Sequence, residues 1–414
     1  MLFSSFSIKN ITNTAPLAVE GIKKAFEDEK LAPYATPYAS LSLPYDLSIP
    51  NIAETLRQAE TLVIIWIGWS NLWTLAVMDA LRMNKKSGKE IISLDTVDTA
   101  DIERNILYLR EKLEKWEHII ITTISKSGTT AETIGIFEIL YTKLYSEYKS
   151  QVHIVTISDP GSKLDLIAEQ QWWIRYHLPK NVGGRYSVLS SVGLFPLLWL
   201  GVDVHSLRVG AREALEDFIK KWWDHPANTV ASSLAGEYKN GRNIFEHFFF
   251  AKNLENLGKW YRQLLAESVG KIQKDGQSIG ITPTTSIGTT DLHSVAQLDL
   301  AHTRDRSMAV VSLRSKNSIR IWSSLLPELV ENIRGKSLDD IMLAAEHGFI
   351  GALKMKDLPV FHYEIEENNA HDLGYFLQTK MLEVMLTGLI LEINPFDQPN
   401  VEDYKIGMKE YMKK

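Results

Sequence analysis

The feature that most constrains the fold of this chain is a regular alternation of short apolar runs with longer amphipathic segments. The apolar runs are rich in β-branched residues, as in strands buried on both faces of a parallel sheet. In the first half, the predicted strands are 62–67, 91–94, the first half of the segment 118–133, and 152–157, and the predicted helices are 51–60, 72–83, 102–115, 131–148 and one near Leu164. This alternation predicts a doubly wound, mainly parallel α/β sheet with helices on both faces.

A second series follows a predicted linking helix at 204–223. Its predicted strands are 243–249, 308–312, 319–321 and 360–365, and its predicted helices are 252–268, 339–354 and 373–391. We expect an N-terminal segment, 1–50, that consists of a helix (18–31) and a connector, followed by a first α/β domain over 51–203. The linking helix and a second α/β domain then occupy 204–395, and a C-terminal loop and helix occupy 396–414. Ligands of such sheets bind beyond the carboxyl ends of the strands, so we expect the two domains to share a cleft there.

Composition narrows the partners and the compartment. The 45 basic and 51 acidic residues are spread evenly and give a net charge of -6, so no basic face predicts nucleic-acid binding. The absence of cysteine excludes disulfides and thiolate metal sites and fits a reducing compartment. The first 30 residues lack a signal-peptide pattern, and the longest apolar run, 188–202, is too short to cross a bilayer. We expect a cytoplasmic protein with a small-molecule partner.

The segment from His118 to Thr133 carries the strongest local signal for a binding site. A buried strand leads into a loop that is crowded with hydroxyls around one ammonium and one glycine, just before a helix begins near Ala131; these residues are Ser125, Lys126, Ser127, Gly128, Thr129 and Thr130. Ser and Thr are common helix caps, but five hydroxyl or ammonium side chains exceed what a cap uses. The helix start also offers free N–H groups and a positive dipole end. The loop therefore predicts an oxyanion site for a phosphate, although it lacks the Walker pattern.

Four further segments hold residues that suit acid, base or anion chemistry. Arg185 follows two glycines, and Glu267 lies four residues after Gln263, on the same face of a predicted helix. His293 stands at a predicted helix start, and Lys405 follows a proline-bounded loop, 394–399. From the residues alone, Arg185 is as compatible with a plain turn as with a site, Glu267 fits a surface ion pair better, and a lone histidine is usually structural.

Taken together, five of these motifs, in the family's order and over nearly the whole chain, resemble the phosphoglucose isomerase family. The matching segments are Ser125-Lys-Ser-Gly-Thr-Thr-Ala-Glu-Thr, Val182-Gly-Gly-Arg-Tyr-Ser-Val-Leu-Ser, Gln263-Leu-Leu-Ala-Glu-Ser, Thr290-Asp-Leu-His-Ser, and Asn394-Pro-Phe-Asp-Gln-Pro with Lys405 seven residues beyond Gln398. The resemblance implies an enzyme of the bacterial type that interconverts glucose 6-phosphate and fructose 6-phosphate in glycolysis and gluconeogenesis. It also implies two sugar isomerase (SIS) domains of flavodoxin-like topology, which agrees with the two α/β series.

The resemblance also implies a role for each site residue and a mechanism through a cis-enediolate that needs no metal or cofactor. Glu267 corresponds to the base that moves a proton between C1 and C2, and Arg185 to the cation that stabilises the enediolate. His293 and Lys405 correspond to the pair that opens the sugar ring, with the histidine donated by the second subunit of a homodimer. The phosphate contacts correspond to Ser70, Ser125, Lys126, Ser127 and Thr130, and the substrate-contacting glutamines to Gln263 and Gln398.

Two alternatives to this function remain at the level of the sequence. An isomerase that also acts on mannose 6-phosphate uses similar chemistry, and its selectivity at C2 depends on the shape of the cleft. A non-catalytic SIS protein that binds phosphosugars needs the phosphate loop but not the base, arginine or histidine motifs, all of which this chain contains.

One turn departs from the family's pattern. After the strand 62–67 the family has Gly-Ile-Gly-Gly-Ser-x-Leu-Gly, whereas this chain has Trp66-Ile-Gly-Trp69-Ser-Asn-Leu-Trp73. Three glycines are replaced by the largest side chain, and overpacking at such positions costs about 1–3 kcal/mol each. We hypothesise that TGA codons, which some bacterial lineages decode as glycine, are written here as tryptophan. The excess of tryptophan, 11 in all, fits this hypothesis, whereas Trp260 occupies a position that suits an aromatic residue. If the three tryptophans are genuine, the turn is remodelled and the isomerase could be inactive.

Peptide masses from the native source, over residues 62–82, test the codon hypothesis. We expect glycine at positions 66, 69 and 73. In that case Trp69→Gly should restore phosphate binding to protein made from the printed sequence, because an indole at 69 fills the volume that the phosphate approaches. Tryptophan at all three positions would end the hypothesis.

Overall fold

The computed structural model describes residues 1–12, 14–83, 88–273, 275–301, 304–314, 319–322 and 329–413, with the side chains of 69–71 left undescribed. The chain forms two compact units. One consists of residues 24–209, and the other combines residues 1–23 with residues 210–414. The helices α1 (Ala15–Leu31) and α8 (Val204–Lys221) contain the points at which the chain passes from one unit to the other.

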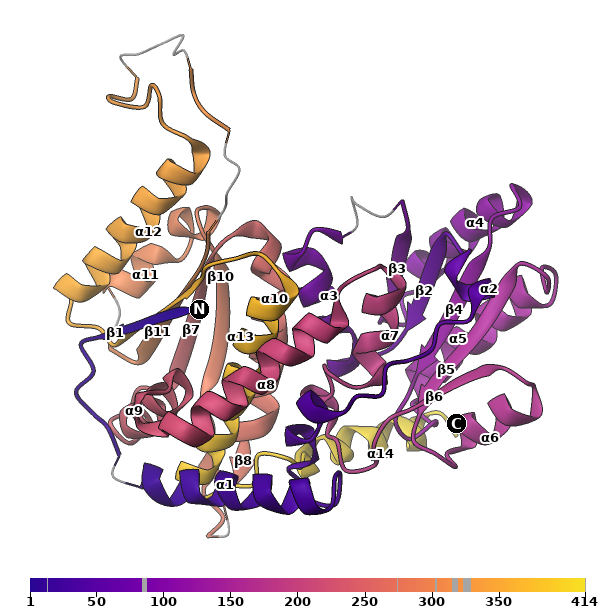
Figure 1. The fold of residues 1–414 in the computed structure, drawn as a ribbon, viewed down its shortest axis with the longest axis horizontal. Coiled ribbons are helices and arrows are strands. Elements are labelled where there is room, and N and C mark those ends of the chain that lie inside the picture. Colours follow the sequence, from indigo (N-terminus) through magenta and orange to yellow (C-terminus); the bar gives the residue numbers. More distant parts are fainter. Residues whose placement is uncertain are drawn as a thin grey trace. The chain divides into compact units, whose positions relative to one another are not determined.

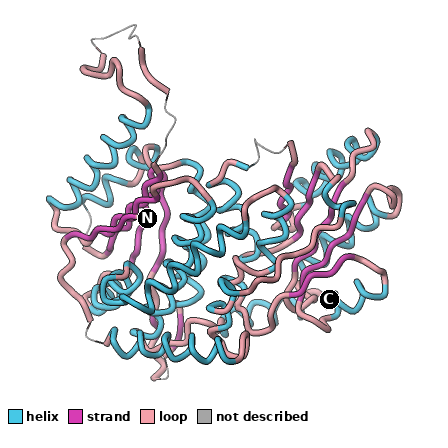
Figure 2. The backbone as a smooth tube through the Cα atoms, viewed as in Figure 1, coloured by secondary structure: helices cyan, strands magenta, loops and turns pink. Residues whose placement is uncertain are grey.

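The unit of residues 24–209 is built on a five-stranded parallel sheet with helices on both faces (Figures 1 and 2). Its strands lie in the order β3-β2-β4-β5-β6: β3 (Glu90–Leu94), β2 (Thr61–Ile65), β4 (Ile119–Ile124), β5 (Val152–Ser158) and β6 (Ile174–His177). Its helices are α2 (Glu54–Arg57), α3 (Trp69–Ala80), α4 (Thr99–Glu114), α5 (Ala131–Leu140), α6 (Lys163–Gln170) and α7 (Ser191–Trp199). This strand order is the flavodoxin-like one.

The other unit repeats this plan in the order β1-β12-β11-β7-β10. β7 (Ile244–Phe250), β10 (Thr282–Ile287), β11 (Arg306–Leu313) and β12 (Val360–Ile365) are parallel, and β1 (Leu2–Phe6) adds an antiparallel edge strand. The helices are α9 (Pro226–Lys239), α10 (Glu255–Val269), α11 (Ala296–Ala301), α12 (Leu338–Met355), α13 (Ala370–Ile390) and α14 (Glu402–Tyr411). A short hairpin, β8 (Lys271–Ile272) and β9 (Ser278–Ile279), follows α10. The predicted fold class, two doubly wound, mainly parallel α/β sheets and a C-terminal helix, is confirmed.

The sequence prediction failed at particular strands. The predicted strand 319–321 is wrong, because in that segment only Arg320 makes an isolated bridge, to Ser337. β1, β6 and β10 were not predicted, and each lies at the edge of its sheet. An edge strand needs no continuous apolar run, and it tolerates a proline such as Pro283 in β10. The predicted division of the chain at 50, 203 and 395 stays a prediction.

A buried ion pair holds α10 against α13 and β12. Lys380 and Glu383 of α13 are fully buried, and the Lys380 ammonium lies 2.7 and 2.8 Å from the two carboxylate oxygens. The hydroxyls of Tyr261, on α10, and Tyr363, on β12, also donate to this carboxylate. Both tyrosine rings lie within 4.5 Å of the ammonium, at 4.2 and 4.4 Å. Both carboxylate oxygens of Glu383 thus accept hydrogen bonds, and the Lys380 ammonium has a counter-charge, as buried charges require.

Two of the three tryptophans at the departing turn are packed in the interior, and the side chain of Trp69 lies outside the described residues. Trp66 is buried, and its indole N–H donates to Ser93 Oγ at 2.7 Å. Trp73, on α3, lies against Gly193 of α7, where an added Cβ would fall 1.9 Å from the indole ring. The indole nitrogen of Trp73 is buried without a hydrogen-bond partner among the described residues. Position 66 thus accommodates its indole better than position 73 does.

Replacing Glu383 with glutamine should strongly destabilise the unit that contains α10. The change leaves the Lys380 ammonium buried without its counter-charge, and breaking a buried pair in this way costs about 3–5 kcal/mol. Chemical denaturation measures the effect. Glu216→Gln is the matched control, because Glu216 pairs with Lys220 at the surface, and it should change the free energy of unfolding by about 0.5 kcal/mol or less. Equal effects of the two substitutions would contradict this account.

Candidate active site

The predicted phosphate loop lies at the carboxyl end of β4, a strand whose six residues are all buried. Ser125 Oγ lies 2.9 Å from Thr130 Oγ1 and accepts a bond from the Thr130 N–H, which closes the loop. Gly128 has φ +67°, and an added Cβ would lie 2.8 Å from the Leu164 backbone nitrogen. A side chain at position 128 would therefore be strained and would push the loop away from α6.

The hydroxyls of this loop do not serve as an ordinary helix cap. Thr130 is the N-cap of α5, yet its side chain accepts no bond from the first-turn N–H groups. Thr130 instead contacts Ser125, and the exposed Ser127 hydroxyl accepts bonds from the N–H and hydroxyl of Thr129. The Thr130 side chain thus leaves the N–H groups that open α5 uncapped, and an anion site there stays a prediction.

Lys126 connects the phosphate loop to the segment that carries Arg185. Its ammonium donates to the Val182 carbonyl oxygen at 3.0 Å. Burial lowers the pKa of Lys126, and the Asp159 carboxylate opposes that shift by favouring the ammonium form. Burial raises the pKa of Asp159, and the charges of Lys126 and Lys180 oppose that shift. An anion bound at the loop would therefore contact the Lys126 ammonium, which lies close to the Asp159 carboxylate.

Arg185 lies in a single turn of 3-10 helix, Gly184–Tyr186, and is 2% exposed. Its guanidinium carbon is 5.5 Å from the centre of the Tyr186 ring. The turn follows β6 after a loop, so it approaches the same carboxyl edge of the sheet as the phosphate loop, and the bond from Lys126 to Val182 joins the two segments. A buried guanidinium in such a turn is fixed in place before any ligand arrives.

The strand order explains why these residues meet. The direction of winding reverses between β2 and β4, and in open α/β sheets the crevice beyond such a switch point is the usual ligand site. The turn after β2 and the loop after β4 border this crevice. Ser70 lies on the first turn of α3, which follows β2, but its side chain lies outside the described part of the chain.

In the other unit, Gln263 and Glu267 lie together on the last turns of α10. The Gln263 amide donates to Glu267 Oε1 at 2.7 Å, which confirms that the two side chains share one face. Glu267 is half-buried.

His293 approaches the opposite end of this sheet. It ends a 3-10 turn, Thr290–His293, that follows the carboxyl end of β10, and its side chain is exposed. α10 starts near this edge: the Asp291 carboxylate contributes to raising the pKa of Lys252, three residues before the helix, so the two side chains are close. The helix then runs back along the strands. Figure 1 shows α11, directly after this turn, at one end of the sheet and β8, directly after α10, at the other. Glu267 thus lies near the amino ends of the strands, away from the carboxyl ends at which a ligand site was expected, and the position of that site stays a prediction.

Gln398 and Lys405 follow the end of α13. Gln398 is half-buried and precedes the turn Pro399–Val401, and Lys405 lies on the first turn of α14. The Lys405 ammonium donates to Glu402 Oε1 at 2.7 Å, a bond that lowers the pKa of Glu402. Within this unit, Lys405 is therefore held by an exposed carboxylate.

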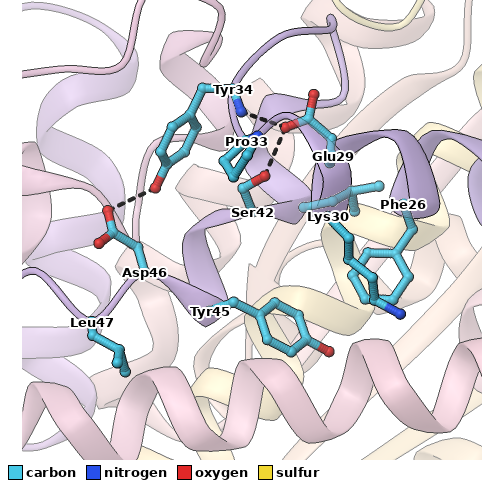
Figure 3. A pocket seen from close by; sticks show the side chains of 10 residues that line it. Phe26, Glu29, Lys30, Pro33, Tyr34, Ser42, Tyr45, Asp46 and Leu47 are labelled. Atoms are coloured by element: carbon cyan, nitrogen blue, oxygen red, sulfur yellow. Dashed lines mark hydrogen bonds between the residues drawn. The ribbon is translucent and has the colours of Figure 1, made fainter.

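A cavity of about 370 Å³ in the unit of residues 24–209 is formed by α1 and the connector after it (Figure 3). Its polar groups bond to one another: the Tyr34 hydroxyl donates to Asp46 at 2.7 Å, and the Ser42 hydroxyl donates to Glu29 at 2.7 Å. Burial, followed by the bond to Asp46, raises the pKa of Tyr34. Because these groups satisfy each other, the cavity is a weaker candidate site than the phosphate loop.

Sequence reasoning missed two polar residues close to the site. Asp159, beside Lys126, stands in the Asp-Pro-Gly turn at the carboxyl end of β5, which is a position that could have been singled out. Lys271 donates to the Glu267 carbonyl oxygen at 2.8 Å, and a lysine just after a helix end was a recognisable signal. Within the described residues, no three His, Asp or Glu side chains gather as a metal site would require, and no helix is long and apolar enough to span a membrane.

Comparisons with known proteins give one consistent result. A model of the phosphoglucose isomerase family matches residues 51–311. Glucose-6-phosphate isomerase of Campylobacter jejuni is 28% identical over 89% of this chain and 90% of its own length. A hypothetical protein from Thermus thermophilus has a crystal structure with a TM-score of 0.82, at 26% identity, over 96% of this chain and 95% of that one. A glucose-6-phosphate isomerase from Chlamydia trachomatis shares the fold, with a TM-score of 0.71 and 18% identity over 99% of this chain and 81% of that one.

Gly128→Ala should weaken phosphate binding by at least about tenfold. The substitution forces a strained backbone and a contact with the Leu164 nitrogen, and strain of about 1–3 kcal/mol moves the loop out of its binding geometry. The inhibition constant of inorganic phosphate measures the change.

Gly135→Ala is the matched control, because Gly135 lies on α5 with nothing within 4 Å of an added Cβ. It should leave phosphate binding unchanged and slightly stabilise the helix. Unchanged phosphate inhibition of the Gly128 variant would show that the anion binds elsewhere.

Proposed function

Because this chain belongs to the phosphoglucose isomerase family, we propose that it interconverts glucose 6-phosphate and fructose 6-phosphate. The observation that carries this function is the single family match over residues 51–311, which includes the phosphate loop, Arg185, Glu267 and His293 together. A protein that only bound phosphosugars would need the loop alone. The curated relatives that are named glucose-6-phosphate isomerase match most of the chain and most of their own length.

In this proposal the loop from Ser125 to Thr130 holds the phosphate of the substrate. Lys126 supplies a positive charge, and the start of α5 supplies N–H groups and the helix dipole. Ser70 is proposed as a further contact from the first turn of α3. Binding at the phosphate fixes one end of the sugar, so that its other end can be aligned with the acid and base groups.

Ring opening and proton transfer are assigned to different residues. We propose that His293 and Lys405 exchange protons with the ring oxygen and O1, which opens the cyclic sugar. Glu267 then moves a proton between C1 and C2, a step for which general-base catalysis contributes about 10² to 10⁴ in rate. The bond from Gln263 orients the carboxylate before attack. Gln398 is proposed to contact the substrate hydroxyls.

Arg185 is proposed to stabilise the cis-enediolate that forms when the proton leaves. Its guanidinium is buried in a tight turn and so needs little reorganisation when negative charge develops. Such preorganised groups contribute about 3 kcal/mol to transition-state stabilisation. A lysine could not reproduce the planar donor arrangement.

We propose a homodimer in which His293 serves the site of the partner subunit. Glu255 and Glu267 are twelve residues apart on α10, which is about 18 Å along the helix axis. His293 lies at the end of the sheet where α10 begins, and Glu267 lies at the other end. Two groups that act on adjacent atoms of one sugar cannot be so far apart. A second copy of the chain solves this problem by supplying the histidine.

The compartment and pathway are proposals of the same kind. The absence of cysteine from all 414 residues fits a reducing compartment, so we propose a cytoplasmic enzyme of glycolysis and gluconeogenesis. A coupled assay that follows fructose 6-phosphate to glucose 6-phosphate, with mannose 6-phosphate as a competitor, tests the activity. No turnover by folded protein with glycine at positions 66, 69 and 73 would overturn the proposal.

Glu267→Gln should lower kcat by at least about 10³ and leave KM nearly unchanged, because it removes proton transfer but not the phosphate contacts. Steady-state kinetics on purified protein measures both constants. Glu255→Gln is the matched control, since Glu255 lies on the same helix in a surface pair with Lys259, and it should keep normal kinetics. Equal losses of binding and turnover in the Glu267 variant would mean that the residue is structural.

Mixing two inactive variants tests the donation of His293 across the dimer. Hybrids of Glu267→Gln with His293→Ala contain one site with both native residues, so we expect partial recovery of activity after subunit exchange. Exchange itself is verified with differently tagged chains. Absence of recovery in verified hybrids would place both residues in one chain.

A further inference from the structure

Lys271 is a nearly buried ammonium beside the proposed base. It is the first residue of β8, two positions after α10 ends, and its side chain is 5% exposed. The chain turns at Gly270, so the Lys271 side chain reaches back toward the helix that it follows. A buried lysine requires acceptors on several sides, and the positions of those acceptors indicate what the residue does.

The acceptors of Lys271 come from two segments. The ammonium donates to the Glu267 carbonyl oxygen at 2.8 Å, at the end of α10. It also donates to the Asp397 carbonyl oxygen and lies 3.2 Å from the Asp397 carboxylate. Asp397 directly precedes Gln398. One cation therefore caps the helix that carries Glu267 and binds the loop that carries Gln398.

The surroundings of Lys271 indicate why its bonds matter for the position of the loop that carries Gln398. A cavity of about 370 Å³ lies beside the loop and is lined in part by Lys271, Asp397 and Asn400. On that side the loop is held by the polar bonds of Lys271. Close by, the Gln273 amide donates to the Leu391 carbonyl oxygen at the end of α13, at 3.0 Å.

We propose that Lys271 is a positioning residue for the isomerisation: it fixes the distance between Glu267 and the loop of Gln398. This inference rests on the proposed function. A carboxylate that must reach two adjacent carbons tolerates little displacement, because a shift of about 1 Å can cost on the order of 10² in rate. Loss of the ammonium frees both segments at once without removing any group that touches the substrate.

Lys271→Met tests the proposal, with Lys259→Met as the matched control, because Lys259 lies on α10 in a surface pair with Glu255. We expect kcat of the Lys271 variant to fall by about 10- to 100-fold, with KM changed by less than about threefold. The isomerisation is also run in D₂O, and NMR measures how much solvent deuterium enters C1 of fructose 6-phosphate. A loosely held carboxylate exchanges its proton with solvent more often, so the deuterium content should rise.

The outcomes separate this inference from the proposed function. If the wild-type protein is inactive, the proposed function is overturned before any variant is compared. If the wild type is active, normal kcat and normal deuterium content in folded Lys271→Met overturn the positioning role. If that variant does not fold, Lys271→Gln replaces it, because its shorter, uncharged side chain cannot reach both carbonyl oxygens; unchanged deuterium content there overturns the role equally.

A second and independent observation concerns two exposed tryptophans at helix ends. Trp116 follows the C-cap of α4 with φ +65°, and Trp172 follows the C-cap of α6 with φ +57°. Both have the paired backbone bonds of a Schellman ending: in α6, for example, the Trp172 N–H donates to the Glu169 carbonyl and the Trp173 N–H to the Ala168 carbonyl. This position is usually glycine, because the left-handed conformation disfavours a Cβ.

Comparison with other positions of the chain shows what is unusual. Gly201 and Gly241 occupy the same place after α7 and α9. Charged residues, Arg82, Asp357 and Glu392, do so after three other helices, so the backbone alone does not select glycine. The two indoles are 76% and 93% exposed and have no hydrogen bond or ring contact among the described residues. Trp173, in contrast, packs edge-on against Phe137, with ring centres 5.4 Å apart.

We infer that positions 116 and 172 are glycine in the natural protein, through TGA codons that its translation system reads as glycine. This inference uses backbone conformation and exposure, and not the family pattern that singled out positions 66, 69 and 73. The codons of the gene and peptide masses from the native source test it. We expect TGA codons and glycine masses at 116 and 172, and TGG codons and tryptophan masses at 173 and 260. TGG codons or tryptophan masses at 116 and 172 would overturn the inference.

Discussion

A helix that follows a parallel strand must run back along the sheet, and the arrangement of this protein's candidate site depends on that constraint. α10 starts near the carboxyl end of β7 and returns toward the amino ends of the strands, where β10 begins. Glu267 lies at the end of this return path, and His293 lies beyond the carboxyl end of β10. One sheet therefore separates two residues whose proposed tasks lie on neighbouring atoms of a sugar. A second copy of the chain reconciles the topology with the chemistry.

The unit of residues 24–209 uses the other edge of its sheet, and its site depends on fixed backbone more than on side chains. The loop after β4 needs a left-handed residue at Gly128 because α6 lies directly beside it. Once this turn is made, Ser125 and Thr130 close the loop, and the start of α5 remains open to an anion. Lys126 then couples the loop to the turn of Arg185 through the Val182 carbonyl. The proposed anion site and the proposed charge-stabilising arginine thus lie on adjacent segments of one sheet edge.

The sequence predicted the fold well where physical patterns are strong. β12 was predicted with its observed bounds, because four of its six residues are apolar and buried. The edge strands β1, β6 and β10 carry polar residues and a proline, so no apolar pattern marked them. The contact between Gln263 and Glu267 followed from helix spacing. Lys271 could not be placed, because its bond to Asp397 spans more than a hundred residues and depends on packing that no local pattern encodes. The roles of the site residues came from resemblance to a family, and the structure supplies their local geometry.

The central claim is that Glu267, Arg185 and a histidine from a second copy act on one bound sugar phosphate. A crystal structure with a five-carbon phosphorylated aldonate, whose carboxylate mimics the enediolate, tests this claim most directly. The account predicts the phosphate in the loop from Ser125 to Thr130, the carboxylate of the ligand beside Glu267 and Arg185, and His293 of the partner subunit at the sugar. A phosphate bound away from that loop, or a ligand contacted by His293 of the same chain as Glu267, would contradict it.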